Sequence, residues 1–155
     1  MNRRKFLKGI AVSGALLAVS PKFMPNGNAE AAGKPKPIPF EEAVKKTLGV
    51  DVSKLEESTD IKLIAPSIAE NGAVVPVKVQ VNLPVEEVKS IHIFAKKNLN
   101  PHTMSMHLSP ANGKAYLGTR IRLAKTMPVV AVAVLNNGKV IKAEKPIKVT
   151  IGGCG

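Results

Sequence analysis

The chain has 155 residues, a length that favours a single domain. Gly and Pro number 12 each and aromatic residues make up 3% of the chain, a balance typical of short strands and many turns rather than of a helical bundle. The formal charge of +12 suggests a nucleic-acid partner, but four Phe, one Tyr and no Trp leave little to stack on bases, and the lysines form no stripe. We therefore expect no nucleic-acid partner.

Residues 1–31 have the pattern of an export signal. Arg3, Arg4, Lys5 and Lys8 precede an apolar run at 9–19 that is too short to span a bilayer, and a small-x-small cleavage site follows at 29–31. The paired arginines resemble the twin-arginine signal, which exports folded proteins. Processing would leave 18 basic and 10 acidic side chains, a charge of +8. The segment predicts a periplasmic protein with no membrane anchor after processing.

The mature chain is predicted to begin with an extended Pro- and Lys-rich linker at 32–39, followed by a short helix at 40–48. Acidic residues lie in the first turn of that helix and basic residues near its end, which suits the helix dipole, and Gly49 is a natural stop. We expect the helix and the strands that follow it, residues 40–151, to form one domain.

Alternating apolar and polar residues indicate strands through the rest of the domain. The clearest alternation runs from Val75 to Leu83, and the continuously apolar run from Val129 to Leu135 is expected of a strand buried on both faces. Asn-Gly pairs at 71–72, 112–113 and 137–138 predict hairpin turns. About seven strands at short spacing predict a mainly β fold, an immunoglobulin-like antiparallel β-sandwich with one short N-terminal helix.

The single cysteine, Cys154, follows the last predicted strand in a tail of Gly152, Gly153, Cys154 and Gly155. It has no partner for a disulfide within the chain, although disulfides are usual in exported proteins. Glycine has the widest backbone freedom, and four extended residues reach about 14 Å, so 152–155 is predicted to be a flexible arm with an exposed thiol. Such a thiol suits a covalent carrier, but a dimer disulfide and an incidental terminal cysteine remain open.

The segment from His102 to His107 contains two Met and two His, which are copper ligands. On a regular strand His102, Met104 and Met106 share one face and His107 takes the other. A copper site on that face is one alternative function. The simpler interpretation, two core methionines with exposed histidines, is favoured, and we expect no metal or other cofactor.

Sequence motifs of hydrolases, nucleotide-binding enzymes and zinc peptidases are absent, so no catalytic residue is assigned and the protein is not expected to be an enzyme.

Three strings together resemble the SoxY family, the sulfur-carrier subunits of the Sox thiosulfate-oxidation complex. They are APSIAENGAVVPV at 65–77, TRIRLA at 119–124 and VTIGGCG at 149–155. The resemblance implies an immunoglobulin-like sandwich in which Cys154 carries sulfur covalently and Gly152, Gly153 and Gly155 form its arm. The family tail usually ends with two glycines after the cysteine, whereas here only Gly155 follows.

The resemblance also implies partners. A small β-sandwich subunit similar to SoxZ would form a heterodimer with this chain. A c-type cytochrome enzyme would join thiosulfate to the cysteine, and a hydrolase would then release sulfate and leave a cysteine persulfide. In some organisms a sulfane dehydrogenase oxidises the remaining sulfur.

Overall fold

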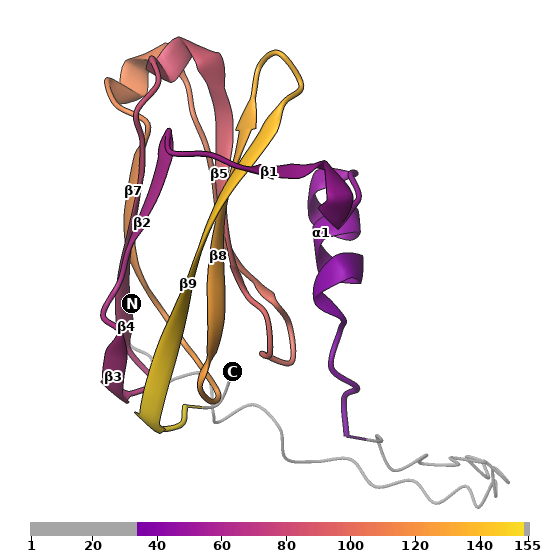
Figure 1. Ribbon diagram of the computed structural model, residues 1–155, viewed down its shortest axis with the longest axis vertical. Coiled ribbons are helices and arrows are strands. Elements are labelled where there is room, and N and C mark those ends of the chain that lie inside the picture. The colour runs from indigo at the N-terminus through magenta and orange to yellow at the C-terminus, as the bar shows by residue number, and fades with distance from the viewer. Residues whose placement is uncertain (1–33, 154–155) are drawn as a thin grey trace, which may run out of the picture. The chain divides into compact units, whose positions relative to one another are not determined.

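The computed structural model describes residues 34–153, which form a β-sandwich with one α-helix on its outside (Figure 1). The elements in chain order are α1 (Phe40–Leu48), η2 (Val52–Lys54), β1 (Leu55–Glu57), β2 (Ile61–Ile64), β3 (Ile68–Asn71), β4 (Val75–Val81), η3 (Val85–Glu87), β5 (Val88–Ala95), β6 (His102–His107), η4 (Pro110–Asn112), β7 (Tyr116–Ile121), β8 (Met127–Leu135) and β9 (Val140–Ile151). The predicted export signal at 1–31 lies outside the described residues.

One sheet has the strand order β1-β9-β8-β5-β6, with β3 also paired to β9, and the other has the order β2-β4-β7. This confirms the predicted mainly β sandwich. The described residues contain nine strands rather than about seven, and the additional β1 and β3 both pair with β9 in parallel. Alternation within a three- or four-residue strand is too short a signal to reveal such pairings.

The core between the sheets is built by alternation. Val75, Val77 and Val79 of β4 point inward and are at most 1% exposed, and they pack in one cluster with Ile91 and Ile93 of β5. The outward residues of β4 are exposed, so this strand matches its prediction. Burying these side chains supplies the main driving force of the fold, roughly 25 cal/mol for each Å² of apolar surface.

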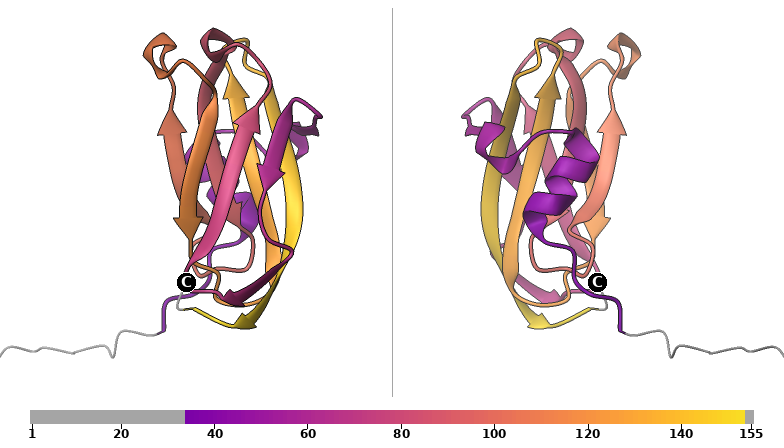
Figure 2. Two further views of the ribbon diagram at one scale, coloured as in Figure 1. Left: turned by 90° about the vertical axis from the view of Figure 1, so that its left-hand side faces the viewer. Right: turned by 90° about the vertical axis from the view of Figure 1, so that its right-hand side faces the viewer.

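A second apolar core lies between the larger sheet and α1, which crosses the outer face of that sheet (Figure 2). Phe40 and Val44 of the helix pack there with Phe94 of β5 and with Val130 and Val132 of β8. The two cores explain why β8 is apolar on both faces, as predicted. The helix spans the predicted residues and ends at Gly49, whose φ of +71° forms the left-handed cap expected of glycine.

The three Asn-Gly pairs do not all form hairpins. Asn137-Gly138 joins the antiparallel strands β8 and β9, with Gly138 at a φ of +87°, as predicted. Asn71-Gly72 joins β3 to β4, and Asn112-Gly113 joins β6 to β7, so in each case the chain passes from one sheet to the other. The hairpin prediction was wrong at these two pairs, because turn preference fixes the local bend and not the sheet that the next strand enters.

The described part of the predicted linker, 34–39, has neither helix nor strand, and the backbone N–H of Ile38 donates to Leu99 O at 2.9 Å. No helix in the described part of the chain combines the length and apolar character needed to cross a membrane.

Candidate functional site at the base of the C-terminal tail

The last strand, β9, ends at Ile151, and the structure describes the next two residues, Gly152 and Gly153. The predicted carrier Cys154 and the last residue, Gly155, lie outside the described residues. We call the part of the sandwich around Ile151, the turn 72–74 and the loop 122–126 the arm end. It is the lower end of the molecule in Figure 1, where β4 begins and β7 ends.

Three backbone hydrogen bonds link the tail, the loop, the turn and the end of β9 in series. Gly153 N–H donates to Leu123 O at 3.0 Å, and Leu123 N–H donates to Gly72 O at 2.7 Å. Gly72 N–H in turn donates to Ile151 O at 2.7 Å, which closes the connection at the end of β9. The segment 151–153 is thus bonded to two segments that are distant from it in the sequence, the turn through Ile151 and the loop through Gly153.

Gly152 and Gly153 are also packed closely against those segments. A Cβ on Gly152 would collide with Ala124 O, and a Cβ on Gly153 would lie 2.7 Å from both N and Cα of Ala73. Real Cβ atoms are not found so near to backbone atoms. Backbone freedom is the role expected of these two glycines in a tail, but in the structure both are in close contact with backbone atoms of other segments.

The loop that receives the tail is held by a buried side chain, Asn98, which is 4% exposed. Its Nδ2 donates to Arg122 O at 2.7 Å, and its Oδ1 accepts from the N–H of Ala124 at 3.0 Å. The two bonds fix the backbone on both sides of Leu123, whose side chain is fully buried. Sequence reasoning missed Asn98, because an Asn in a polar segment between strands normally indicates only a turn.

Two exposed cations flank this loop. Arg122 lies immediately before Leu123, and Lys125 follows Ala124, and neither forms an ion pair among the described residues. Cations near a thiol favour its thiolate form and attract anionic groups, with an effect that weakens in salt.

The copper alternative on β6 is wrong, and the favoured interpretation of two core methionines with exposed histidines holds only for Met106 and His107, since Met104 is 37% exposed and His102 is half-buried. The pairing of β5 with β6 shifts between Ile93 and Phe94, so that Met104 lies opposite Ile93 but His102 lies opposite Phe94. This irregularity turns His102 onto the face away from Met104, because the strict alternation of side chains is interrupted there.

The shifted register instead gathers three histidines on the helix side of the sheet. The ring centroid of His92 lies 5.9 Å from that of His102 and 6.2 Å from that of His107. Nε2 of His92 lies 2.9 Å from Ser90 Oγ, while His92 Nδ1 and His102 Nε2 are buried and find no hydrogen-bond partner among the described residues.

Burial, with smaller contributions from the positive charges of His102 and His107, lowers the pKa of His92 from 6.5 to about 4. Burial also lowers the pKa of His102, against a backbone hydrogen bond that raises it. Within residues 34–153, no three His, Cys, Asp or Glu side chains are grouped so that they could hold a metal ion.

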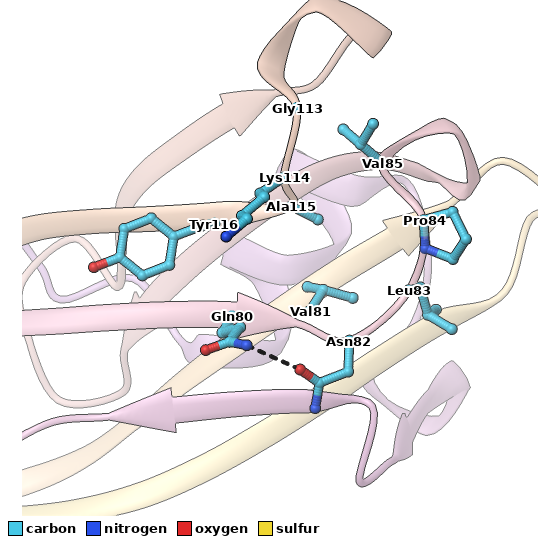
Figure 3. A pocket seen from close by; sticks show the side chains of 10 residues that line it. All are labelled: Gln80, Val81, Asn82, Leu83, Pro84, Val85, Gly113, Lys114, Ala115 and Tyr116. Atoms are coloured by element: carbon cyan, nitrogen blue, oxygen red, sulfur yellow. Dashed lines mark hydrogen bonds between the residues drawn. The ribbon is translucent and has the colours of Figure 1, made fainter.

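A half-open pocket of about 640 Å³ lies at the opposite end of the sandwich, beyond the last residue of β4 (Figure 3). Its polar side chains include Gln80, Asn82, Lys114 and Tyr116, and the Gln80 amide donates to the Asn82 side chain at 3.1 Å. Its lining includes no His, Cys, Asp or Glu, and Lys114 and Tyr116 are its titratable side chains.

The family model described as sulfur oxidation protein SoxY matches residues 45–154 of this chain. The solved structure of the sulfur carrier protein SoxY from Chlorobium limicola is similar with a TM-score of 0.55 and 40% sequence identity, covering 63% of this chain and 84% of that protein. A search of the curated proteins finds no match.

Superoxide reductases share the fold at low identity. The enzyme from Ignicoccus hospitalis has a TM-score of 0.52 and 21% identity, over 72% of this chain and 99% of that one. One from Thermotoga maritima, described as putative, has a TM-score of 0.50 and 14% identity, over 64% and 98%. At these identities the likeness concerns the fold alone.

Proposed function

The chain belongs to the SoxY family of sulfur oxidation proteins, and from this premise we propose that it carries sulfur intermediates of thiosulfate oxidation covalently on Cys154. The family match, which extends to residue 154, is the observation that carries the proposal. Cys154 is the only thiol of the chain and therefore the only side chain able to form a persulfide.

The chemistry requires two steps at the thiol, each performed by a partner enzyme. In the first, a c-type cytochrome enzyme accepts two electrons, and the Cys154 thiol loses its one proton, as the sulfur of Cys154 and the sulfane sulfur of the thiosulfate dianion form a bond, which gives a cysteine S-thiosulfonate. In the second, a hydrolase adds water across the bond between the sulfane sulfur and the sulfonate, which releases sulfate and leaves the persulfide. The bound sulfane sulfur is then oxidised or transferred.

The protein is a carrier in this scheme and not the catalyst. Covalent catalysis requires a base within hydrogen-bond reach of the nucleophile. The groups that contact Gly152 and Gly153 are backbone atoms of residues 72–73 and 123–124, which supply no general base. Partner enzymes must therefore provide the acid, the base and the electron acceptor.

The remaining parts of the proposal follow from the sequence. The export signal at 1–31 would deliver the folded protein to the periplasm, together with a small sandwich subunit similar to SoxZ. The tail after β9 would present Cys154 to the active site of the cytochrome enzyme, of the hydrolase and, where present, of a sulfane dehydrogenase.

Intact-mass measurement of the protein from cells grown on thiosulfate tests the proposal. We expect adducts with the masses of a thiosulfonate and of additional sulfur atoms, which reductant removes and Cys154→Ser abolishes. An unmodified mass during active thiosulfate oxidation would contradict it. A disulfide dimer as the functional species, seen on non-reducing gels, would support the dimer alternative instead.

A further inference from the structure

The tail of this chain is held at its base by a backbone socket, which consists of the turn 72–73 and the loop 122–124. Gly72 is buried and occupies the centre of it, since its N–H bonds to Ile151 at the end of β9 and its C=O bonds to Leu123. Gly153 bonds to the other side of Leu123. Gly72 of the turn is thus bonded to Ile151, and Leu123 of the loop is bonded to Gly153. Both ends of the segment 151–153 are held in this way.

Gly72 and Gly153 fit against each other because both lack a side chain. A Cβ on Gly72 would collide with Leu123 O and would lie 2.8 Å from Val149 Cγ1 and 3.0 Å from Gly153 N. A Cβ on Gly153 would lie 2.9 Å from the carbonyl carbon of Gly72. Neither residue has a positive φ, so the requirement for glycine here is steric and not conformational.

The socket is rigid on the side of the sandwich. Asn98 bonds to the backbone of Arg122 and Ala124, and the side chain of Leu123 is inserted fully into the core between the sheets. Leu123 O, which accepts the hydrogen bond from the Gly153 N–H, is therefore part of the packed domain. The tail can leave the socket only by breaking this hydrogen bond and the close contact of Gly153 with the turn.

We propose that Gly72 is a positioning residue for the reactions of Cys154: it holds Gly152 and Gly153 in the socket, so that the chain leaves the domain at a fixed point immediately before Cys154. This inference rests on the proposed carrier function. Three free residues, 152–154, would extend about 10 Å and one extends about 3.4 Å, so the reach of the chain up to the cysteine falls roughly threefold. Partner enzymes must then approach the arm end itself.

Alanine variants of the glycines test the socket in the full-length processed protein. Gly72→Ala changes the part of the socket that belongs to the folded domain. Gly153→Ala changes the part that belongs to the tail, where a substitution is not expected to prevent folding. Gly118→Ala is the matched control, because the nearest atoms to a Cβ there belong to the side chain of Tyr116, at 3.1 Å or more, and φ is again not positive.

A nitroxide label on Cys154 measures how fast the tail turns, and hydrogen exchange measures the protection of the Gly153 amide. We expect two- to threefold faster label rotation and at least tenfold faster exchange in both socket variants, with no change in Gly118→Ala. The double variant should equal either single variant, since both remove the same contact. With the sulfur-ligating enzyme, KM for the carrier should rise three- to tenfold, with a smaller change in kcat.

The outcomes separate the two proposals. If the wild-type protein is never loaded at Cys154, the carrier function fails. If the wild-type protein is loaded but Gly153→Ala has wild-type label rotation, amide exchange and KM, the carrier function stands and the socket is overturned. A change in thermal stability alone, with these three quantities unaltered, also overturns the positioning role of Gly72.

Discussion

Lowering the pH from 7 to 5 is expected to reduce the free energy of unfolding by about 2 kcal/mol through one buried histidine, His92. His92 is 4% exposed and lies beside His102 and His107, and its pKa falls from 6.5 to about 4 in the folded protein. Because the unfolded chain binds the proton more tightly, protonation favours unfolding. The stabilising contribution is complete above pH 6.5 and is lost as the pH falls toward 4.

The magnitude follows from the difference between the two pKa values. The full shift corresponds to about 3 kcal/mol at pH 4 and below, and about 2 kcal/mol of this is already lost at pH 5. The lowered pKa of His102 acts in the same direction. Carboxylates titrate mainly below pH 5, so the range from pH 7 to 5 isolates the histidines.

Urea unfolding at pH 7, 6 and 5 measures this slope. His92→Leu removes the titrating group and should flatten the dependence, whatever its effect on stability at pH 7. His107→Gln, which removes a neighbouring charge from an exposed site, should reduce the slope only slightly. The reasoning is refuted if the wild-type protein loses less than about 0.5 kcal/mol between pH 7 and 5, or if His92→Leu keeps the full slope.

Three further predictions concern the arm end and the helix. Asn98→Leu should destabilise the fold by about 2–4 kcal/mol in urea unfolding, because it leaves the partly buried Arg122 O and Ala124 N–H unpaired; a loss below 1 kcal/mol would show that water replaces the amide. Phe40→Ala should cost about 3 kcal/mol and release α1 while the sheets persist, since Phe40 packs edge-on against Phe94 at 5.8 Å; hydrogen exchange confined to the helix would confirm this, and global loss of protection would contradict it. Arg122→Gln with Lys125→Gln should slow an anionic thiol reagent at Cys154 about twofold to threefold more than a neutral one at low salt; equal slowing would mean that these charges do not act on the thiol.

The sequence alone determined the features that depend on neighbouring residues. The alternation of β4, the doubly apolar β8, the helix with its glycine stop and the sandwich class all follow from local pattern, because burial on a face repeats with the period of the element. The single cysteine and the family strings pointed to a carrier in the same way, from residues near each other in the chain.

Only the tertiary structure decided what depends on residues that are distant in the sequence. Pairing with β5 interrupts the alternation of β6 and moves His102 to the face opposite Met104. The socket forms where Gly72, Leu123 and Gly153 meet, and no pattern within one segment records that meeting. The sequence does not distinguish a glycine that is needed for backbone flexibility from one that is needed because another backbone segment packs against it. That difference depends on which segment of the folded chain lies beside the glycine.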